Sequence, residues 1–175
     1  MTLNLNRPLA IPARRHVLAA AIVSAMMPAF AAPAWSDTSA TTRNETIVRQ
    51  AFERWAAGEN VFPLLLSPDV VWTIPGSGPV AGTYRGFTDF VEKASRPLVS
   101  RLATPIVPDV RHIWAAGDTV IVRFDGAATT TAGHPYRNQF VWIFRMGDGR
   151  VVEAEAFLDL AAYQQVVENN PVRAR

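Results

Sequence analysis

The stretch Thr119–Leu160, TVIVRFDGAATTTAGHPYRNQFVWIFRMGDGRVVEAEAFLDL, decides the fold of this chain. β-Branched and aromatic residues dominate it, and two turn-forming segments divide it, Thr131-Ala132-Gly133-His134 and Gly147-Asp148-Gly149. Hydrophobic runs separated by short glycine-containing turns are typical of antiparallel hairpins. The stretch therefore predicts three consecutive strands and then a helix, for which Asp159 is the N-cap.

Helix and strand patterns precede this meander. Apolar residues at three- and four-residue spacing predict an amphipathic helix that ends at Gly58: Ile47, Val48, Ala51, Phe52 and Trp55. Thr42-Arg43-Asn44-Glu45 matches a capping box at its start, which leaves the polar residues 35–43 as a predicted linker. A second helix is expected to have Thr88 as its N-cap and to kink or end at Pro97. Strands are predicted at 70–74 and 110–115. Helices followed by long antiparallel strands indicate one α+β domain over residues 44–170, with the helices on one face of a curved sheet.

Residues 1–34 have the pattern of an export signal. Arg7, Arg14 and Arg15 form a basic segment, the apolar run 17–27 is shorter than the ~20 residues of a membrane span, and small-x-small cleavage motifs follow. We therefore expect a signal peptide and an exported protein, periplasmic or secreted, that is not integral to a membrane. Arg14-Arg15 also fits the twin-arginine signal, so this route and the general secretory route both stay open.

Charge and cysteine content exclude several function classes. Three of the 17 basic residues and none of the 15 acidic ones lie in residues 1–34, so the remainder carries a net charge near −1 and offers no basic surface for nucleic acid. The absence of cysteine excludes disulfides and thiolate metal sites. Beyond the leader, the chain has only His112 and His134, which are far apart and have no carboxylates at ligand spacing. We expect neither a metal nor another cofactor.

Several short motifs resemble the nuclear transport factor 2-like superfold, in its SnoaL-like and ketosteroid-isomerase-like branch. The motifs span residues 44–168: Trp72, Gly82-x-Tyr84-x-Gly86, 116–120, Tyr136-x-Asn138 and 149–153 running into 157–159. The resemblance implies a cone-shaped, cystatin-like α+β barrel with an apolar cavity between its concave sheet face and its helices. It also implies a homodimer through the convex face. It does not fix the function, because this superfold hosts several enzyme classes and pure binding proteins.

The last hairpin predicts one wall of that cavity. A three-residue turn at 147–149 would pair Phe144 with Val152 and Trp142 with Ala154, and would turn Glu153 and Glu155 outward. Residues on the inward face and on the preceding elements are then expected to bind an apolar substrate: Trp55, Trp72, Tyr84, Asn138, Phe140 and Trp142. Among them, Tyr84 and Asn138 are the predicted hydrogen-bond anchors for a carbonyl or hydroxyl group.

The candidate catalytic residues are Arg123, Asp125 and His112. Epoxide hydrolases of the superfold combine an Arg-x-Asp with an Asp on the last strand. Arg123-Phe124-Asp125 resembles the first half of that arrangement, but Ala156 stands in the second position, so the catalytic pair is incomplete. His112 is expected to share a strand face with Val110 and Trp114, either as a general base or as a structural histidine.

The orientation of Arg123 and Asp125 depends on the turn near Gly133. A loop of two or four residues turns both side chains into the cavity, whereas a three-residue loop turns them to the convex face. The x-Gly pair favours the even loop. Facing inward, Asp125 would act as a general base; the alternative is a structural ion pair with Arg123.

Two functions are consistent with these residues. One is cofactor-free acid–base catalysis on a small hydrophobic molecule, of the isomerase, cyclase or hydratase type. The other is binding of such a molecule without turnover. A carboxylate or imidazole close to Tyr84 or Asn138 would favour the enzyme.

Overall fold

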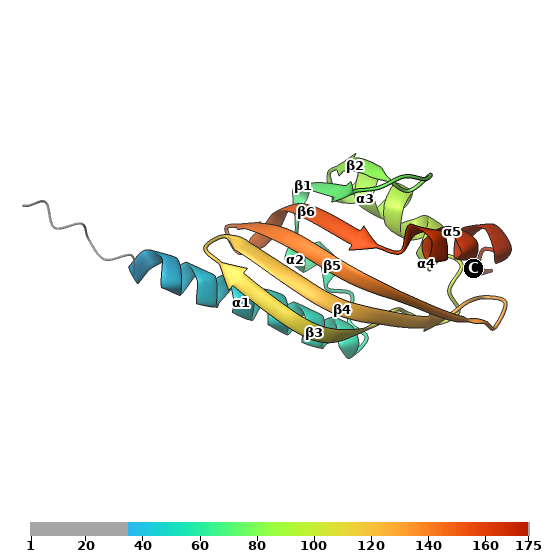
Figure 1. The fold of residues 1–175 in the computed structure, drawn as a ribbon, viewed down its shortest axis with the longest axis horizontal. Helices are drawn as coiled ribbons and strands as arrows, with labels where there is room; N and C mark the ends of the chain where they lie inside the picture. Colours follow the sequence, from blue (N-terminus) through green and yellow to red (C-terminus); the bar gives the residue numbers. More distant parts are fainter. Residues whose placement is uncertain (1–34, 175) are drawn as a thin grey trace, which may run out of the picture. The chain divides into compact units, whose positions relative to one another are not determined.

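Six strands form one curved sheet in the computed structural model, which describes residues 35–174 (Figure 1). The strands are β1 (Leu66–Ile74), β2 (Gly82–Arg85), β3 (Val107–Ala116), β4 (Thr119–Thr129), β5 (Pro135–Gly147) and β6 (Arg150–Leu158). Their order in the sheet is β2-β1-β6-β5-β4-β3. The α+β class and the three-strand meander are confirmed, and the sheet is mixed because β1 runs parallel to β6. The predicted signal peptide, 1–34, lies outside the described residues.

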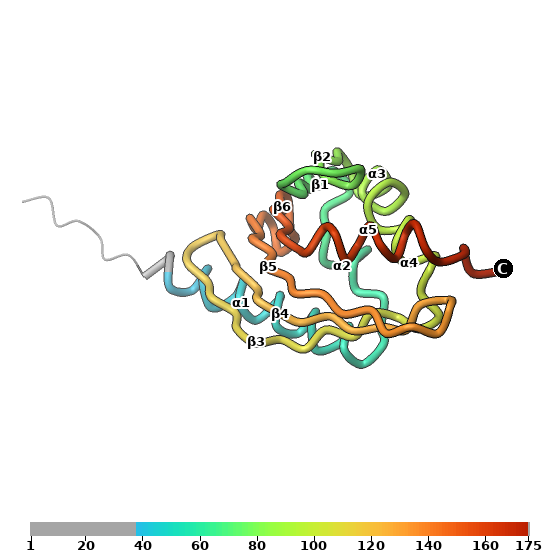
Figure 2. Tube along the Cα trace, turned by 45° about the vertical axis from the view of Figure 1, so that its right-hand side comes forward, coloured from blue at the N-terminus to red at the C-terminus, as the bar shows by residue number. Residues whose placement is uncertain are grey.

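Helices precede, interrupt and follow these strands. They are α1 (Trp35–Ala56), α2 (Phe62–Leu65), α3 (Phe87–Phe90), the π-helical turn η1 (Val91–Ser95), α4 (Arg96–Val99) and α5 (Leu160–Asn169). Figures 1 and 2 both show α1 running alongside β3, and α4 beside α5 near the end of β6. Phe52 of α1 packs against Phe124 of β4, with 5.1 Å between ring centroids. We call the sheet face that Phe124 belongs to the inner face and the opposite one the outer face.

Helix α1 already includes residues 35–43, so the segment predicted as a linker is helical, and the capping box predicted at Thr42 is wrong. The Thr42 hydroxyl donates to the Thr38 carbonyl at 3.0 Å, as in a helix interior, rather than capping a helix end. Two contacts with the β3–β4 turn stabilise this first part of the helix. The Gly117 amide donates to Thr41 Oγ1 at 2.8 Å, and Asn44 Nδ2 donates to the Gly117 carbonyl at 3.0 Å. Both bonds join residues far apart in the sequence, which local patterns cannot predict.

The helix that was predicted to have Thr88 as its N-cap is α3. It starts at Phe87, directly after Gly86, so Thr88 is not its N-cap. Gly86 has φ = 89°, a left-handed backbone conformation that only glycine adopts at little cost. The irregularity predicted at Pro97 takes the form of η1, the π-helical turn directly before α4. A wider turn fits there because the proline ring would clash with the preceding turn of a regular α-helix.

The β5–β6 hairpin has a register two residues away from the predicted one. Trp142 pairs with Ala156 and Phe144 with Ala154, and a β-bulge follows at Arg145/Met146. A shift of two residues preserves which face each side chain occupies. Asn138, Phe140, Trp142, Ala154 and Ala156 are therefore buried on the inner face, while Glu153 and Glu155 are exposed, as expected. The bulge places Val151, rather than Val152, in the core.

Candidate functional site

Aromatic rings from three strands and three helical segments fill the inner face of the sheet. They form one connected aromatic cluster: Phe52, Trp55, Phe62, Trp72, Phe90, Phe124, Phe140, Trp142 and Phe144. Trp55 stacks on Trp142 with an interplanar angle of 9° and a centroid distance of 5.7 Å. Phe124 stacks on Phe140 at 4.7 Å. Offset-stacked and edge-to-face pairs of this kind favour further aromatic or planar groups as neighbours.

The predicted hydrogen-bond anchors are both occupied by main-chain partners. The Tyr84 hydroxyl donates to the Val80 carbonyl at 2.7 Å. Asn138 Nδ2 donates to Tyr136 Oη and to the Asp159 carbonyl, each at 2.9 Å. Asn138 Oδ1 accepts from the amides of Gln139 and Asp159. The Asn138 amide has no further hydrogen-bonding capacity, and within residues 35–174 neither anchor is bonded to a carboxylate or an imidazole.

The even loop predicted near Gly133 is wrong, and Arg123 and Asp125 consequently lie on the outer face. Arg123 pairs with Val141 and Asp125 with Gln139, while the Thr130 amide donates to the His134 carbonyl across a three-residue loop. Val122 and Phe124 are fully buried on the inner face instead. The pair does not reach the aromatic cluster, where its predicted chemistry would be needed.

Asp125 belongs to an ion-pair network on the outer face. Its carboxylate contacts Arg123 Nη1 at 2.6 Å and Arg111 Nη2 at 2.8 Å, and Arg111 also contacts Asp109 at 2.8 Å. The hydrogen bond from Arg123, followed by that from Arg111, lowers the pKa of Asp125 below its ordinary value. Asp125 is therefore ionised, and its two oxygens are engaged by guanidinium groups.

His112 also lies on the outer face, because a β-bulge at Arg111 interrupts β3. The bulge reverses the alternation, so Val110 faces inward opposite Phe124, whereas His112 pairs with Arg123. The expected shared face of His112 and Val110 is therefore wrong. His112 does share its face with Trp114, and the two rings lie edge-on at 5.0 Å.

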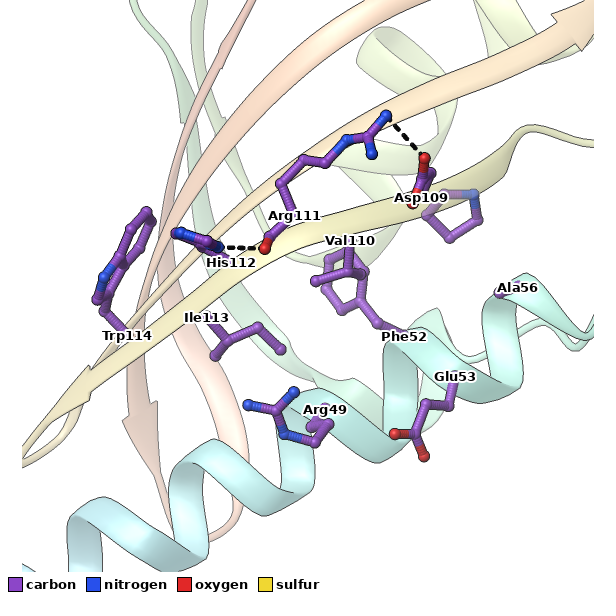
Figure 3. Close-up of a pocket in the computed structure, with 11 residues that line it drawn as sticks. Arg49, Phe52, Glu53, Ala56, Asp109, Val110, Arg111, His112, Ile113 and Trp114 are labelled. Carbon is purple, nitrogen blue, oxygen red and sulfur yellow. Dashed lines mark hydrogen bonds and ion pairs between the residues drawn. The ribbon is translucent and has the colours of Figure 1, made fainter.

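A groove of about 590 Å³ lies between α1 and β3 (Figure 3). Its apolar part comes from Phe52, Val110 and Ile113, and Arg49 projects from α1 toward Ile113. The remaining residues around it are Glu53, Ala56, Pro108, Asp109, Arg111, His112 and Trp114. Of the predicted site residues, only His112 lines this groove. Residues 49, 52, 53 and 56 share one face of α1, and this spacing can be recognised in the sequence. It does not identify the strand that forms the other side of the groove.

Phe52 connects the groove to the aromatic cluster. It is 2% exposed and lines the groove, and its ring contacts Trp55, Phe124 and Trp142 at centroid distances of 5.5, 5.1 and 5.9 Å. A molecule bound in the groove would therefore touch one wall of the cluster.

One polar atom inside the cluster has no partner. Trp72 is 1% exposed, and its indole Nε1 donates to no acceptor within residues 35–174. The Trp72 ring itself contacts the rings of Phe90, Trp142 and Phe144.

In the part of the chain that the structure describes, no three His, Cys, Asp or Glu side chains come together at a spacing suited to a metal ion. None of the helices described there is long and apolar enough to cross a membrane.

A family model described as "SnoaL-like domain" matches residues 48–154, which is more than half of the chain. The chain belongs to the SnoaL-like family. The matched region runs from α1 into β6 and includes the groove and the whole aromatic cluster. No curated protein matches the sequence significantly.

Solved structures of similar fold have low sequence identity. A SnoaL-like polyketide cyclase, described as putative, from Jannaschia sp. CCS1 is 19% identical, with a TM-score of 0.60 over 75% of this chain and 96% of that one. TerC co-crystallised with polyporic acid is 21% identical, with a TM-score of 0.59 over 73% and 99%. IdmH of Streptomyces antibioticus, also described as a putative polyketide cyclase, is 19% identical, with a TM-score of 0.54 over 71% and 98%. At these identities the similarity shows the fold alone.

Proposed function

We propose that this SnoaL-like domain binds a planar, apolar small molecule in the groove between α1 and β3 and does not convert it. The observation that carries the proposal is the groove itself: its apolar part includes Phe52, which also belongs to the aromatic cluster. The rest of the exposed lining is mainly polar, which suits a ligand that carries polar substituents on a planar apolar core. Arg49 and Arg111 beside the groove would tolerate an acidic substituent on the ligand.

The positions of the polar residues argue for binding rather than catalysis. Tyr84 and Asn138 are bonded to main-chain groups, and Asp125 is bonded to two arginines on the outer face. A general base must reach the proton that it removes, to within a hydrogen bond or one bridging water. Asp125 does not meet this condition for a molecule beside Phe52.

A second candidate function rests on His112, which borders the groove at the edge strand β3 although its ring lies on the outer face. In that case the imidazole would act as a general base on a molecule bound there. Incubating candidate ligands with the protein and analysing them by mass spectrometry separates the two functions. Unchanged ligand supports binding alone, and conversion that is lost in His112→Ala supports acid–base catalysis.

Two neighbouring alanines provide a matched test of the groove. Ala56 lines it and Ala57 does not, although both are exposed near the end of α1. Polyporic acid, present in the TerC structure, is a suitable first probe because it is a planar quinone bearing two phenyl rings. By isothermal titration calorimetry we expect Ala56→Phe to weaken binding at least about tenfold. Ala57→Phe should leave the affinity unchanged. Equal affinities of the two variants, or no binding by the unmodified protein, would reject the groove as the site.

We further propose a homodimer formed through the outer face. Trp114 and Phe157 are 50% and 41% exposed there, and Ile121, Val141 and Ile143 lie between them in the strand pairing. An apolar band of this kind on an exposed sheet face is typical of an interface. Light scattering should report a dimer for the protein and for Leu64→Arg, an exposed site on α2, and a monomer for Ile143→Arg. A monomeric unmodified protein at micromolar concentration would exclude this dimer.

Export remains a proposal supported by the sequence of residues 1–34. We propose that this segment directs the chain to the periplasm or beyond and is then removed. Intact-mass analysis of the protein from the extracytoplasmic fraction should give a chain starting close to residue 35. Replacing Arg14 and Arg15 by lysine should block export only if the twin-arginine route is used.

A further inference from the structure

The unpartnered indole N–H of Trp72 is the one donor in the described part of the chain that is both buried among aromatic rings and unbonded. Most buried donors in folded proteins have an acceptor, because an unpaired N–H loses its bonds to water without replacement. Trp72 lies on β1 opposite Tyr84, and its ring stacks on Phe90 with 4.2 Å between centroids. The indole is therefore held in place while its N–H lacks a partner.

Aromatic rings connect this N–H to the groove. Phe52 lines the groove and contacts Trp142, and Trp142 contacts Trp72 at 5.1 Å with an interplanar angle of 84°. The Phe52 ring separates the groove from the interior. Because a phenyl ring makes no hydrogen bonds, it can rotate or shift without losing any. A planar ligand that displaces the Phe52 ring would lie against Trp142, and it would reach the Trp72 N–H only if the Trp142 ring also shifts.

We infer that Trp72 Nε1–H is a donor subsite for a neutral oxygen acceptor, such as an aryl ketone, on the apolar ligand of this protein. The inference rests on the proposed binding function and names the ligand class more closely. A neutral acceptor fits because the rings around the indole, Phe90, Trp142 and Phe144, provide no counter-charge for an anion. A ketone oxygen would bond an N–H that otherwise has no partner.

The other buried polar groups strengthen the assignment to Trp72. The Tyr84 hydroxyl donates to Val80, the Tyr163 hydroxyl donates to Ala94, and the Asn138 amide is fully bonded. A ligand that recruited any of these donors would have to break an existing bond. Trp72 can donate without such an exchange.

The experiment compares 9-fluorenone with fluorene, two rigid planar molecules that differ by one ketone oxygen. Protein labelled with ¹⁵N at its tryptophan indoles is titrated with each ligand, and the Trp72 resonance is followed. We expect fluorenone to move this resonance downfield and fluorene to leave it nearly in place. In binding assays, Trp72→Phe should lower the affinity for fluorenone about tenfold and that for fluorene less than twofold. Leu64→Ala, an exposed side chain on α2 that does not line the groove, is the control and should change neither.

The outcomes separate this inference from the proposed function. If both ligands bind and Ala56→Phe blocks both, but the Trp72 resonance does not respond to fluorenone, the groove function stands and the Trp72 subsite is wrong. A Trp72 proton that is shifted upfield in the free protein and unmoved by either ligand would show that it already points at the Trp142 ring, and would also overturn the inference. If neither ligand nor polyporic acid binds, both proposals fail. The resonance test needs no variant, so it remains decisive if Trp72→Phe does not fold.

Discussion

Asn138 and Asp159 form a reciprocal bracket in which the amide side chain of one satisfies both main-chain groups of the other. Asn138 Nδ2 donates to the Asp159 carbonyl and Oδ1 accepts from the Asp159 amide, both at 2.9 Å. Asp159 is in turn the N-cap of α5, where its carboxylate accepts from the amides of Ala161 and Ala162. The bracket therefore fixes the start of α5 to β5.

Replacing Asn138 by leucine should destabilise the protein substantially. Each main-chain group or hydroxyl left without a partner costs about 1–3 kcal/mol of folding free energy. Chemical denaturation monitored by circular dichroism gives the change in unfolding free energy. Gln139→Leu is the control, because this side chain is exposed and the bond from Gln139 to Asn138 uses only the main-chain amide of Gln139. Equal stability of the two variants would show that the bracket contributes little.

Asp125 should make the stability dependent on pH in the acid range. Its pKa is lowered by Arg123 and Arg111, so its contribution is present above the ordinary carboxyl pKa near 4 and is lost as the pH falls toward the lowered value. Asp125→Asn should therefore show a shallower loss of stability below about pH 4 than the unmodified protein. Asp69→Asn is the control, since the Asp69 carboxylate takes part in no ion pair within residues 35–174. If the two variants lost stability equally as the pH falls in the acid range, the prediction would be contradicted.

The three tyrosines should resist ionisation in the folded protein. Burial raises the pKa of Tyr84, Tyr136 and Tyr163, that of Tyr136 to about 12. A raised pKa contributes stability below the ordinary value near 10, and this stability is lost as the pH rises through the folded value. Ultraviolet absorbance of tyrosinate should therefore remain low at pH 10 to 11 and rise together with unfolding. Full titration near pH 10 without loss of structure would be the contrary result.

A methyl group added at Gly126 should disturb the aromatic cluster. A Cβ at this position would lie 2.8 Å from Phe140 Cε2 and 3.1 Å from Ile106 Cγ2. The Phe140 ring cannot move away freely because it stacks on Phe124 at 4.7 Å. We expect Gly126→Ala to lose about 1–3 kcal/mol of unfolding free energy by thermal or chemical denaturation, as overpacking does elsewhere. Ala127→Ser, on an exposed side chain of the same strand, should be close to neutral.

Sequence patterns predicted the strands better than the faces their side chains occupy. The alternation of Val120, Val122 and Phe124 is strong, but Ile121 on the other face is also apolar, so the pattern alone did not distinguish the two. The deciding quantity was the number of residues in the loop at Gly133, and the x-Gly pair favoured the wrong parity. Face assignment is sensitive to such single-residue differences because strand side chains alternate with a period of two.

The candidate site was less predictable than the fold because it depends on contacts distant in the sequence. The bulge at Arg111, which turns His112 outward, has no marker such as glycine. The groove needs α1 and β3 together, and the contacts that fix α1 there run from Thr41 and Asn44 to Gly117. Phe140 and Trp142, by contrast, were correctly assigned to the buried face of the last hairpin, because large apolar side chains are seldom left in solvent.

The parallel pairing of β1 with β6 has a consequence for the order of folding. Trp72 aligns with Ala154, so the β1–β2 hairpin has no place in the sheet until nearly the whole domain is available. Pairings of such high contact order form late, because closing a long loop is entropically costly. The β3–β4–β5–β6 meander, whose neighbours are adjacent in the chain, can assemble first and then serve as the template for β1. Ribosome-bound or truncated chains that end before β6 should consequently leave Trp72 exposed to solvent, where it could engage a chaperone.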